Sequence, residues 1–158
     1  MPTATAAQLY DEDFFRWTQE QSKLLREAAE RRVNLPLDWE NLAEEIESLG
    51  KSQRAELRNR LATVIEHLLK LEHSIASEPR NGWLETVERT RGEAKLLLED
   101  NPSLRREVAD LVDTMFRKFA GFALNDLIRR GEMDKARRSE IIARPYTEDQ
   151  VLGDWFPG

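Results

Sequence analysis

The chain has 158 residues, a formal net charge of −6 at pH 7, a hydrophobic fraction of 40% and no cysteine. This length and hydrophobic content are typical of one globular domain, and the lack of cysteine excludes disulfides, thiolate metal sites and a cysteine nucleophile. The sequence contains neither a signal-peptide pattern nor an apolar run of about 18 residues. We therefore expect residues 1–158 to form a single soluble, cytoplasmic domain without a membrane span, with residues 1–8 flexible.

Apolar residues recur at three- and four-residue spacing through most of the chain, which predicts amphipathic helices. Capping residues, glycines and prolines then set the expected ends of five main helices. The first runs from Asp11 or Asp13 to about Arg32, the second from the cap Asp38 to a stop at Gly50, and the third from near Ser52 to before Pro79; the fourth follows Asn81-Gly82 and ends at Asp100, and the fifth runs from Pro102 to about Arg130, before Gly131.

The C-terminal part predicts shorter elements. A weaker helix is expected over 133–143, and Thr147 to Gln150 has the form of a capping box that opens a short helix. Trp155 and Phe156 are expected to pack the tail, residues 144–158, on the other helices. No segment alternates as a β-strand would, and no internal repeat is visible. The predicted fold class is therefore an all-α helical bundle.

The only two histidines, His67 and His73, lie on the predicted third helix. A di-iron or di-manganese bundle site needs Glu-x-x-His pairs, but Val64 and Lys70 occupy the positions three residues before the histidines. At 100° per residue, His67 lies at the edge of the apolar stripe and His73 lies on its polar side. We accordingly assign no catalytic, cofactor-binding or metal-binding residue and expect no cofactor.

Two carboxylates nevertheless attract interest. Glu45, on the predicted second helix, could meet His67 across a helix pair and form a general acid/base dyad, which keeps a hydrolase-like enzyme as an alternative. The competing interpretation places both at the rim of the bundle, with His67 structural and partly buried. Glu72 points into the apolar stripe of the third helix, so it needs solvent at the bundle end or an arginine partner.

The segment from Arg129 to Arg144 is the one basic region, with six basic residues against three acidic ones. It leaves open a second alternative, a small nucleic-acid-binding regulator. The negative net charge of the chain argues against nucleic-acid binding, because such binding depends on neutralising phosphates with basic residues. We expect this segment to be a solvated helix face and nucleic acid to be an improbable partner.

The fifth helix carries two apolar registers on different faces, and a helix that is apolar nearly all round must be covered on all sides. The registers are Leu104, Val108, Leu111, Val112, Met115, Phe119 and Phe122, and then Phe116, Ala120, Ala123, Leu124, Leu127 and Ile128. A bend at Gly121 could let both registers pack within one chain. The other interpretation is a homodimer through this helix, which Leu124→Asp would split while helicity is kept.

Five blocks of the sequence together resemble the bacterial family known as domain of unknown function 29. They are Leu9–Phe14, Trp39–Ser52, His67–Lys70, Asn101–Leu104 and Pro145–Thr147. The chain departs from the family pattern at Leu71, Glu72 and His73, where tryptophan and glutamine-rich polar residues are usual. The resemblance implies an α-helical bacterial protein without an established activity, and it directs attention to Glu45, His67 and Lys70.

These observations favour a non-enzymatic helical module that binds its own copy or another bacterial protein. The absence of phosphate-binding, nucleophile-elbow and zinc-protease motifs supports this choice over an enzyme.

Overall fold

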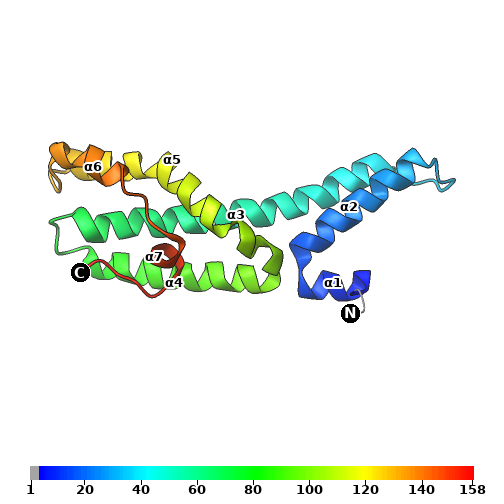
Figure 1. Cartoon of the computed structure of the whole chain (residues 1–158), viewed down its shortest axis with the longest axis horizontal. Coiled ribbons are helices and arrows are strands. Elements are labelled where there is room, and N and C mark those ends of the chain that lie inside the picture. Colours follow the sequence, from blue (N-terminus) through cyan, green and yellow to red (C-terminus); the bar gives the residue numbers. More distant parts are fainter. Residues whose placement is uncertain (1–3) are drawn as a thin grey trace. The chain divides into compact units, whose positions relative to one another are not determined.

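A computed structural model describes residues 4–158, and these residues form helices and no β-strand (Figure 1). The all-α prediction is confirmed. The helices are α1 (Ala6–Glu12), α2 (Phe14–Glu30), α3 (Trp39–His73), α4 (Arg80–Asp100), α5 (Val108–Arg129), α6 (Arg138–Ile142) and α7 (Glu148–Leu152), with 3₁₀ turns η1 (Pro102–Glu107) and η2 (Lys135–Arg137). Within residues 4–158, none of the helices has both the length and the apolar character needed to cross a membrane.

The chain divides into two compact units, although no change of composition marks the division in the sequence. Unit 1 comprises the residues up to Glu56 together with Leu97–Arg105, and unit 2 comprises Leu57–Leu96 together with Arg106–Gly158. Flexibility was expected for residues 1–8; the first three lie outside the described residues, and Ala6 to Gln8 belong to α1, whose capping box is made by Thr5 and Gln8.

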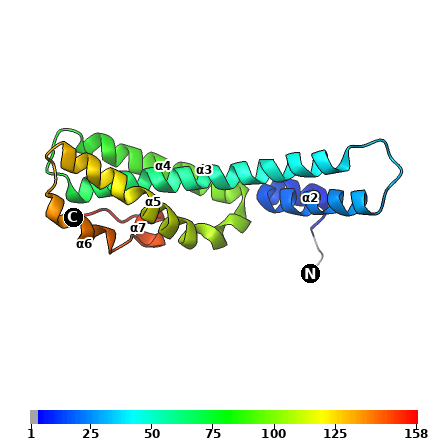
Figure 2. The same ribbon diagram turned by 90° about the horizontal axis from the view of Figure 1, so that it is seen from above.

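Helix α3 runs without interruption from Trp39 to His73, so the predicted end of a helix at Gly50 is wrong. Gly50 is instead a packing residue. A Cβ atom at this position would lie 2.2 Å from Thr18 Oγ1 of α2, which is closer than two such atoms approach. The missing side chain lets α2 pack tightly against the first part of α3, as the hairpin of these two helices shows (Figures 1 and 2).

Two polar side chains join distant segments of unit 1. Asn101 is fully buried; its Oδ1 accepts from the backbone N–H of Phe15 at 2.9 Å, and its Nδ2 donates to the Leu97 carbonyl at 2.8 Å. In return, Asp13 caps α2 through the Arg16 N–H and accepts from both the N–H and the hydroxyl of Ser103. Asp13 was predicted to start this helix, whereas the long-range bonds were not predicted.

The core of unit 2 is formed by the second part of α3, by α4 and by α5. Its fully buried apolar side chains include Leu61, Leu68, Val87, Phe116 and Leu124. Arg60 of α3 forms an ion pair with Glu93 of α4, with 2.7 Å between nitrogen and oxygen.

The predicted stop at Gly131 is confirmed. Gly131 has a φ of +70°, and the following residue, Glu132, donates its N–H to the Leu127 carbonyl, as in a Schellman cap.

Replacing Gly50 by alanine should destabilise the protein by about 1–3 kcal/mol, because the new methyl group overpacks against Thr18. Urea denaturation followed by circular dichroism measures the change. Gly92 is the matched control: it also lies inside a helix, and nothing is within 4 Å of the position of its Cβ. Gly92→Ala should stabilise by up to about 1 kcal/mol, as helix propensity alone requires. Equal effects of the two substitutions would contradict the packing role of Gly50.

Asn101→Ala should lower the free energy of unfolding by about 2–4 kcal/mol, because it leaves the buried N–H of Phe15 without a partner. The same denaturation experiment tests this expectation. Asn59→Ala, at an exposed position within α3, should change stability by no more than about 0.5 kcal/mol. A neutral Asn101→Ala variant would show that these hydrogen bonds do not hold unit 1 together.

Candidate functional site

The structure does not bring Glu45 and His67 together. A dyad between them required two separate helices, but both residues lie on the continuous helix α3, 22 positions apart. At about 1.5 Å of rise per residue, this spacing separates them by about 33 Å along the helix axis. The prediction that Glu45 and His67 lie on two separate helices was therefore wrong.

His67 and Lys70 make local contacts on α3. His67 is partly buried, as predicted, and its Nδ1 donates to the Thr63 carbonyl at 2.9 Å. The expected contact of His67 with a separate second helix does not exist, because that helix is the first part of α3. Lys70 forms an ion pair with Glu66 at 2.7 Å. These bonds, each within one turn of α3, occupy both side chains of the family block.

The C-terminal end of α3 differs from its prediction. His73, expected on the polar side, has a side chain that is only 9% exposed, whereas Ile75, two residues later, is 82% exposed. The reason is the chain segment that follows α5. Glu132 accepts from the Ser74 hydroxyl at 2.7 Å and from the Ile75 N–H at 3.1 Å, so this segment returns to the end of α3, and η2 and α6 then line a cavity together with His73.

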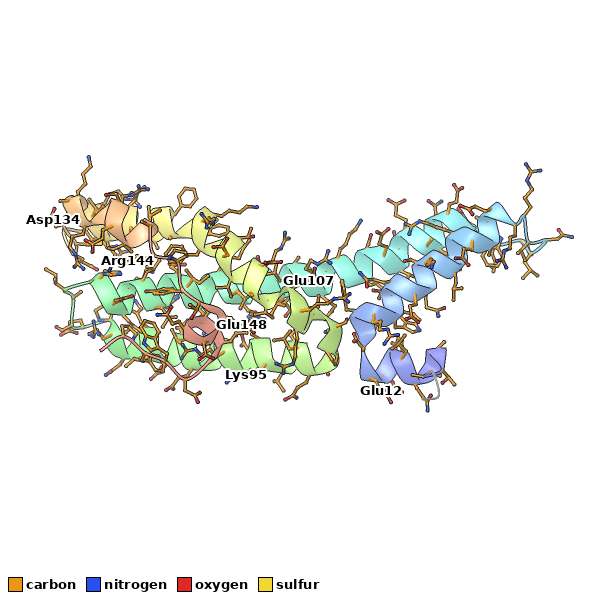
Figure 3. All side chains as sticks on the ribbon, viewed as in Figure 1. Glu12, Lys95, Glu107, Asp134, Arg144 and Glu148 are labelled. Atoms are coloured by element: carbon orange, nitrogen blue, oxygen red, sulfur yellow. The ribbon has the colours of Figure 1, made fainter. Side chains whose placement is uncertain are left out.

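Glu72 and His73 border a cavity of about 320 Å³ in unit 2. Helix α3 contributes these two residues and Leu69, and Phe116 comes from α5. The other wall is formed by η2, α6, α7 and the loop between the last two, through Arg137, Glu140, Ile141, Arg144, Pro145, Tyr146 and Gln150. Figure 3 shows Arg144 and Glu148 at the two ends of this loop.

Glu72 reaches solvent, which was one of its two predicted outcomes, and its side chain is 35% exposed. Tyr146, and not an arginine, donates a short hydrogen bond to Glu72 Oε2. Burial and this hydrogen bond both raise the pKa of Tyr146, so its phenol stays protonated. The Tyr146 ring packs edge-on against Phe116 at 5.4 Å between centroids. Glu72 Oε2 also lies 3.5 Å from Nε2 of His73. The three polar side chains thus form one cluster in the cavity wall.

His73 combines burial with an incomplete set of hydrogen bonds. Burial lowers the pKa of its imidazole, Glu72 opposes that shift, and the positive charge of Arg137 adds to it. The ring is therefore held in its neutral form at neutral pH. Among the described residues, its Nδ1 is the buried side-chain nitrogen or oxygen atom without a hydrogen-bond partner. Such an atom is unusual in a folded protein, where most buried polar atoms have a hydrogen-bond partner.

Arg91 holds the wall that carries Tyr146, and the sequence analysis did not single it out. Its guanidinium is buried and donates to the carbonyls of Gln150, Val151 and Trp155 at 2.7–2.8 Å. It also lies over the Phe156 ring, 4.7 Å from the centroid. The capping box at the start of α7 is confirmed. Arg91 lies on the apolar face of α4, four residues after Val87. A charged residue on an apolar face is the sequence signal that could have identified Arg91 as important.

The basic segment, residues 129–144, is partly neutralised by neighbouring acidic residues. Arg129 and Arg130 both form ion pairs with Asp126 at 3.0–3.1 Å, and Arg144 lies 3.8 Å from Glu140. Arg138 crosses to α5, where its Nε donates to Asn125 Oδ1 at 2.8 Å. Gly121 gives that guanidinium room, because a Cβ there would lie 2.8 Å from the Arg138 side chain.

Helix α5 buries one register and leaves part of the other exposed. Leu124 is fully buried, so the expectation that Leu124→Asp would act only on a dimer is wrong: a charge there would disrupt the core of unit 2. Phe119 and Phe122 are 43% and 70% exposed, with ring centroids 6.3 Å apart. They border a groove of about 420 Å³, lined also by Asn59, Ala62, Thr63, Glu66, Ala123 and Asp126.

The model of the family "Domain of unknown function DUF29" matches residues 9–156. The chain belongs to this family. Among solved structures, the chain is similar to an α-helical protein of unknown function from Rhodospirillum rubrum, with 24% identity and a TM-score of 0.74. The match covers 98% of this chain and 93% of the other and supports the helical fold alone. A search of the curated proteins found no match.

Replacing His73 by glutamine should make the stability of the protein less dependent on pH. The pKa of His73 is lowered from 6.5 on folding, so the unfolded chain binds more protons just below that pH. The contribution of neutral His73 to the free energy of unfolding of the wild type is complete above pH 6.5. It is lost as the pH falls below that value. Urea titrations at about pH 7.5 and 5.5 measure the difference, with His67→Gln as a control for losing one imidazole. An unchanged pH dependence in His73→Gln would contradict this assignment.

Proposed function

We propose that the protein is a non-enzymatic interaction module that forms a homodimer through α5. The observation that carries the proposal is the exposed pair Phe119 and Phe122 beside the groove that they share with α3. The two aromatic rings line this groove together with Ala62 and Ala123. Aromatic side chains that remain exposed beside a hollow are typical of protein interfaces.

Charge complementarity favours a second copy as the partner. Lys118 and Asp126 lie four residues before and after Phe122, so both flank it at a distance of about one helical turn. If two α5 helices cross antiparallel at Phe122, Lys118 of each copy lies level with Asp126 of the other. Such a contact is isologous, because the same patch serves on both partners.

The geometry of the groove fits the same arrangement. Phe122 of one copy would enter the groove of the other, where Ala62 and Thr63 of α3 leave room because their side chains are small. Glu66 and Asp126 border the groove and would face Lys118 of the incoming helix. A stable interface buries about 800 Å² on each partner, so we expect α3 and α5 to contribute together. The cytoplasmic location expected from the sequence belongs to this proposal.

Phe122→Glu should weaken self-association by at least about 30-fold, the effect of losing one central aromatic anchor. Light scattering coupled to size exclusion measures the mass, and circular dichroism checks that the helices are kept. Leu96→Glu is the matched control, because Leu96 is also a large apolar side chain on a helix and is 61% exposed, on α4. It should leave the dimer intact.

A charge exchange tests the identity of the partner. Lys118→Glu and Asp126→Lys should each weaken the dimer. The double variant should form a stronger dimer than either single variant, because the pairs between copies are reversed, but it should not regain full affinity because the ion pairs of Asp126 with Arg129 and Arg130 are lost. A monomeric wild-type protein at tens of micromolar would overturn the homodimer. Dissociation by Leu96→Glu as readily as by Phe122→Glu would place the interface elsewhere.

A further inference from the structure

The cavity beside His73 has the construction of a small-molecule site. Leu69, Phe116 and Ile141 supply apolar walls, and Glu72, His73 and Tyr146 supply a small number of polar groups. Known ligand sites combine these two elements and have volumes from about 300 Å³ upward. At about 320 Å³, this cavity has room for roughly ten non-hydrogen atoms, since one water occupies about 30 Å³ of liquid.

The charges around the cavity balance, and they lie on different elements. Glu72, on α3, is negative and engages the buried Tyr146 hydroxyl. Arg137, on η2, is positive and exposed, and Arg144 is only loosely paired with Glu140 at 3.8 Å. Both charges act on His73, because Glu72 raises the pKa of its imidazole and Arg137 lowers it. A ligand with one charge would be repelled by one of these groups, whereas a dipolar ligand can be attracted by both.

The chemistry of the polar groups further limits the class of ligand that the cavity can bind. Among residues 4–158, no three His, Asp or Glu side chains are grouped in a way that could hold a metal ion. A guanidinium binds a carboxylate through paired hydrogen bonds, and a carboxylate such as Glu72 accepts from an ammonium group. The imidazole of His73, whose side chain is itself nine-tenths buried, forms part of the cavity wall beside Glu72.

We propose that the cavity bordered by Glu72, His73, Arg137 and Tyr146 binds a small apolar α-amino acid as its zwitterion. The carboxylate of the ligand pairs with Arg137, the ammonium group faces Glu72, and the apolar side chain packs against Leu69, Phe116 and Ile141. This binding site lies apart from the exposed Phe119 and Phe122 of the proposed dimer interface, whose groove shares none of its lining residues.

The test uses the full chain, with L-leucine as the probe and two analogues that each lack one charge. The analogue 4-methylpentanoate lacks the ammonium group, and 3-methylbutylamine lacks the carboxylate. The chain has two histidines, so the Cε1–H nuclear magnetic resonance signal of His73 reports on the site and that of His67 serves as an internal reference. His67→Gln assigns the two signals.

Leucine should shift the His73 signal saturably at millimolar concentration or below, as expected for a ligand of this size, and leave His67 in place. Neither analogue should saturate the shift up to about 10 mM. Arg137→Ala should raise the dissociation constant for leucine at least about tenfold. Lys135→Ala, an exposed cation in the same 3₁₀ turn but outside the cavity wall, should change it by less than about twofold.

Three results would overturn the proposal. The first is the absence of a saturable shift at His73 with leucine, and the second is an equal response to either analogue, which would show that a single charge suffices. The third is an unchanged dissociation constant in Arg137→Ala. Because Arg137 is exposed and its side chain makes no hydrogen bond or ion pair among the described contacts, that variant should fold as the wild type does.

Discussion

The start of helix α2 carries backbone N–H groups that the helix itself cannot satisfy, and unit 1 is organised around meeting that requirement. Asp13 satisfies one group locally, but the N–H of Phe15 is satisfied by Asn101, from the end of α4. Ser103 returns two hydrogen bonds to Asp13. Asp13, Asn101 and Ser103 belong to two of the sequence blocks on which the family resemblance rests. Those blocks, far apart along the chain, therefore meet as one reciprocal cap.

Local signals in the sequence predicted the local structure well. Asp13, Asp38 and Thr147 cap helices where their side chains suggested, and Gly131 ends α5. Gly50 was misread because a glycine has two uses that look the same in sequence: it can end a helix, or it can admit a close neighbour. Only the position of Thr18, more than 30 residues away, decides between these uses.

The candidate site shows the same limit. A helical wheel predicted that Glu72 reaches solvent or pairs with an arginine; its carboxylate reaches solvent and also accepts a hydrogen bond from Tyr146, in another family block. The wheel placed His73 in solvent because periodicity describes one helix at a time. The segment around Glu132 bonds to Ser74, next to His73, and it follows the left-handed turn at Gly131. The path of the chain after α5 depends on tertiary packing, so it cannot be predicted from the periodicity of a single helix.

The buried guanidinium of Arg91 recognises the C-terminal tail in a particular way, because all three of its oxygen acceptors belong to the main chain. Every residue type carries such a carbonyl, so this anchor requires a path of the backbone and not a set of side chains. A substitution at Gln150, which is partly exposed, changes the side chain that the tail presents and keeps the carbonyl that Arg91 binds, whereas position 91 has no such freedom. The exposed side chains of the tail can therefore vary while Arg91 keeps its backbone in place.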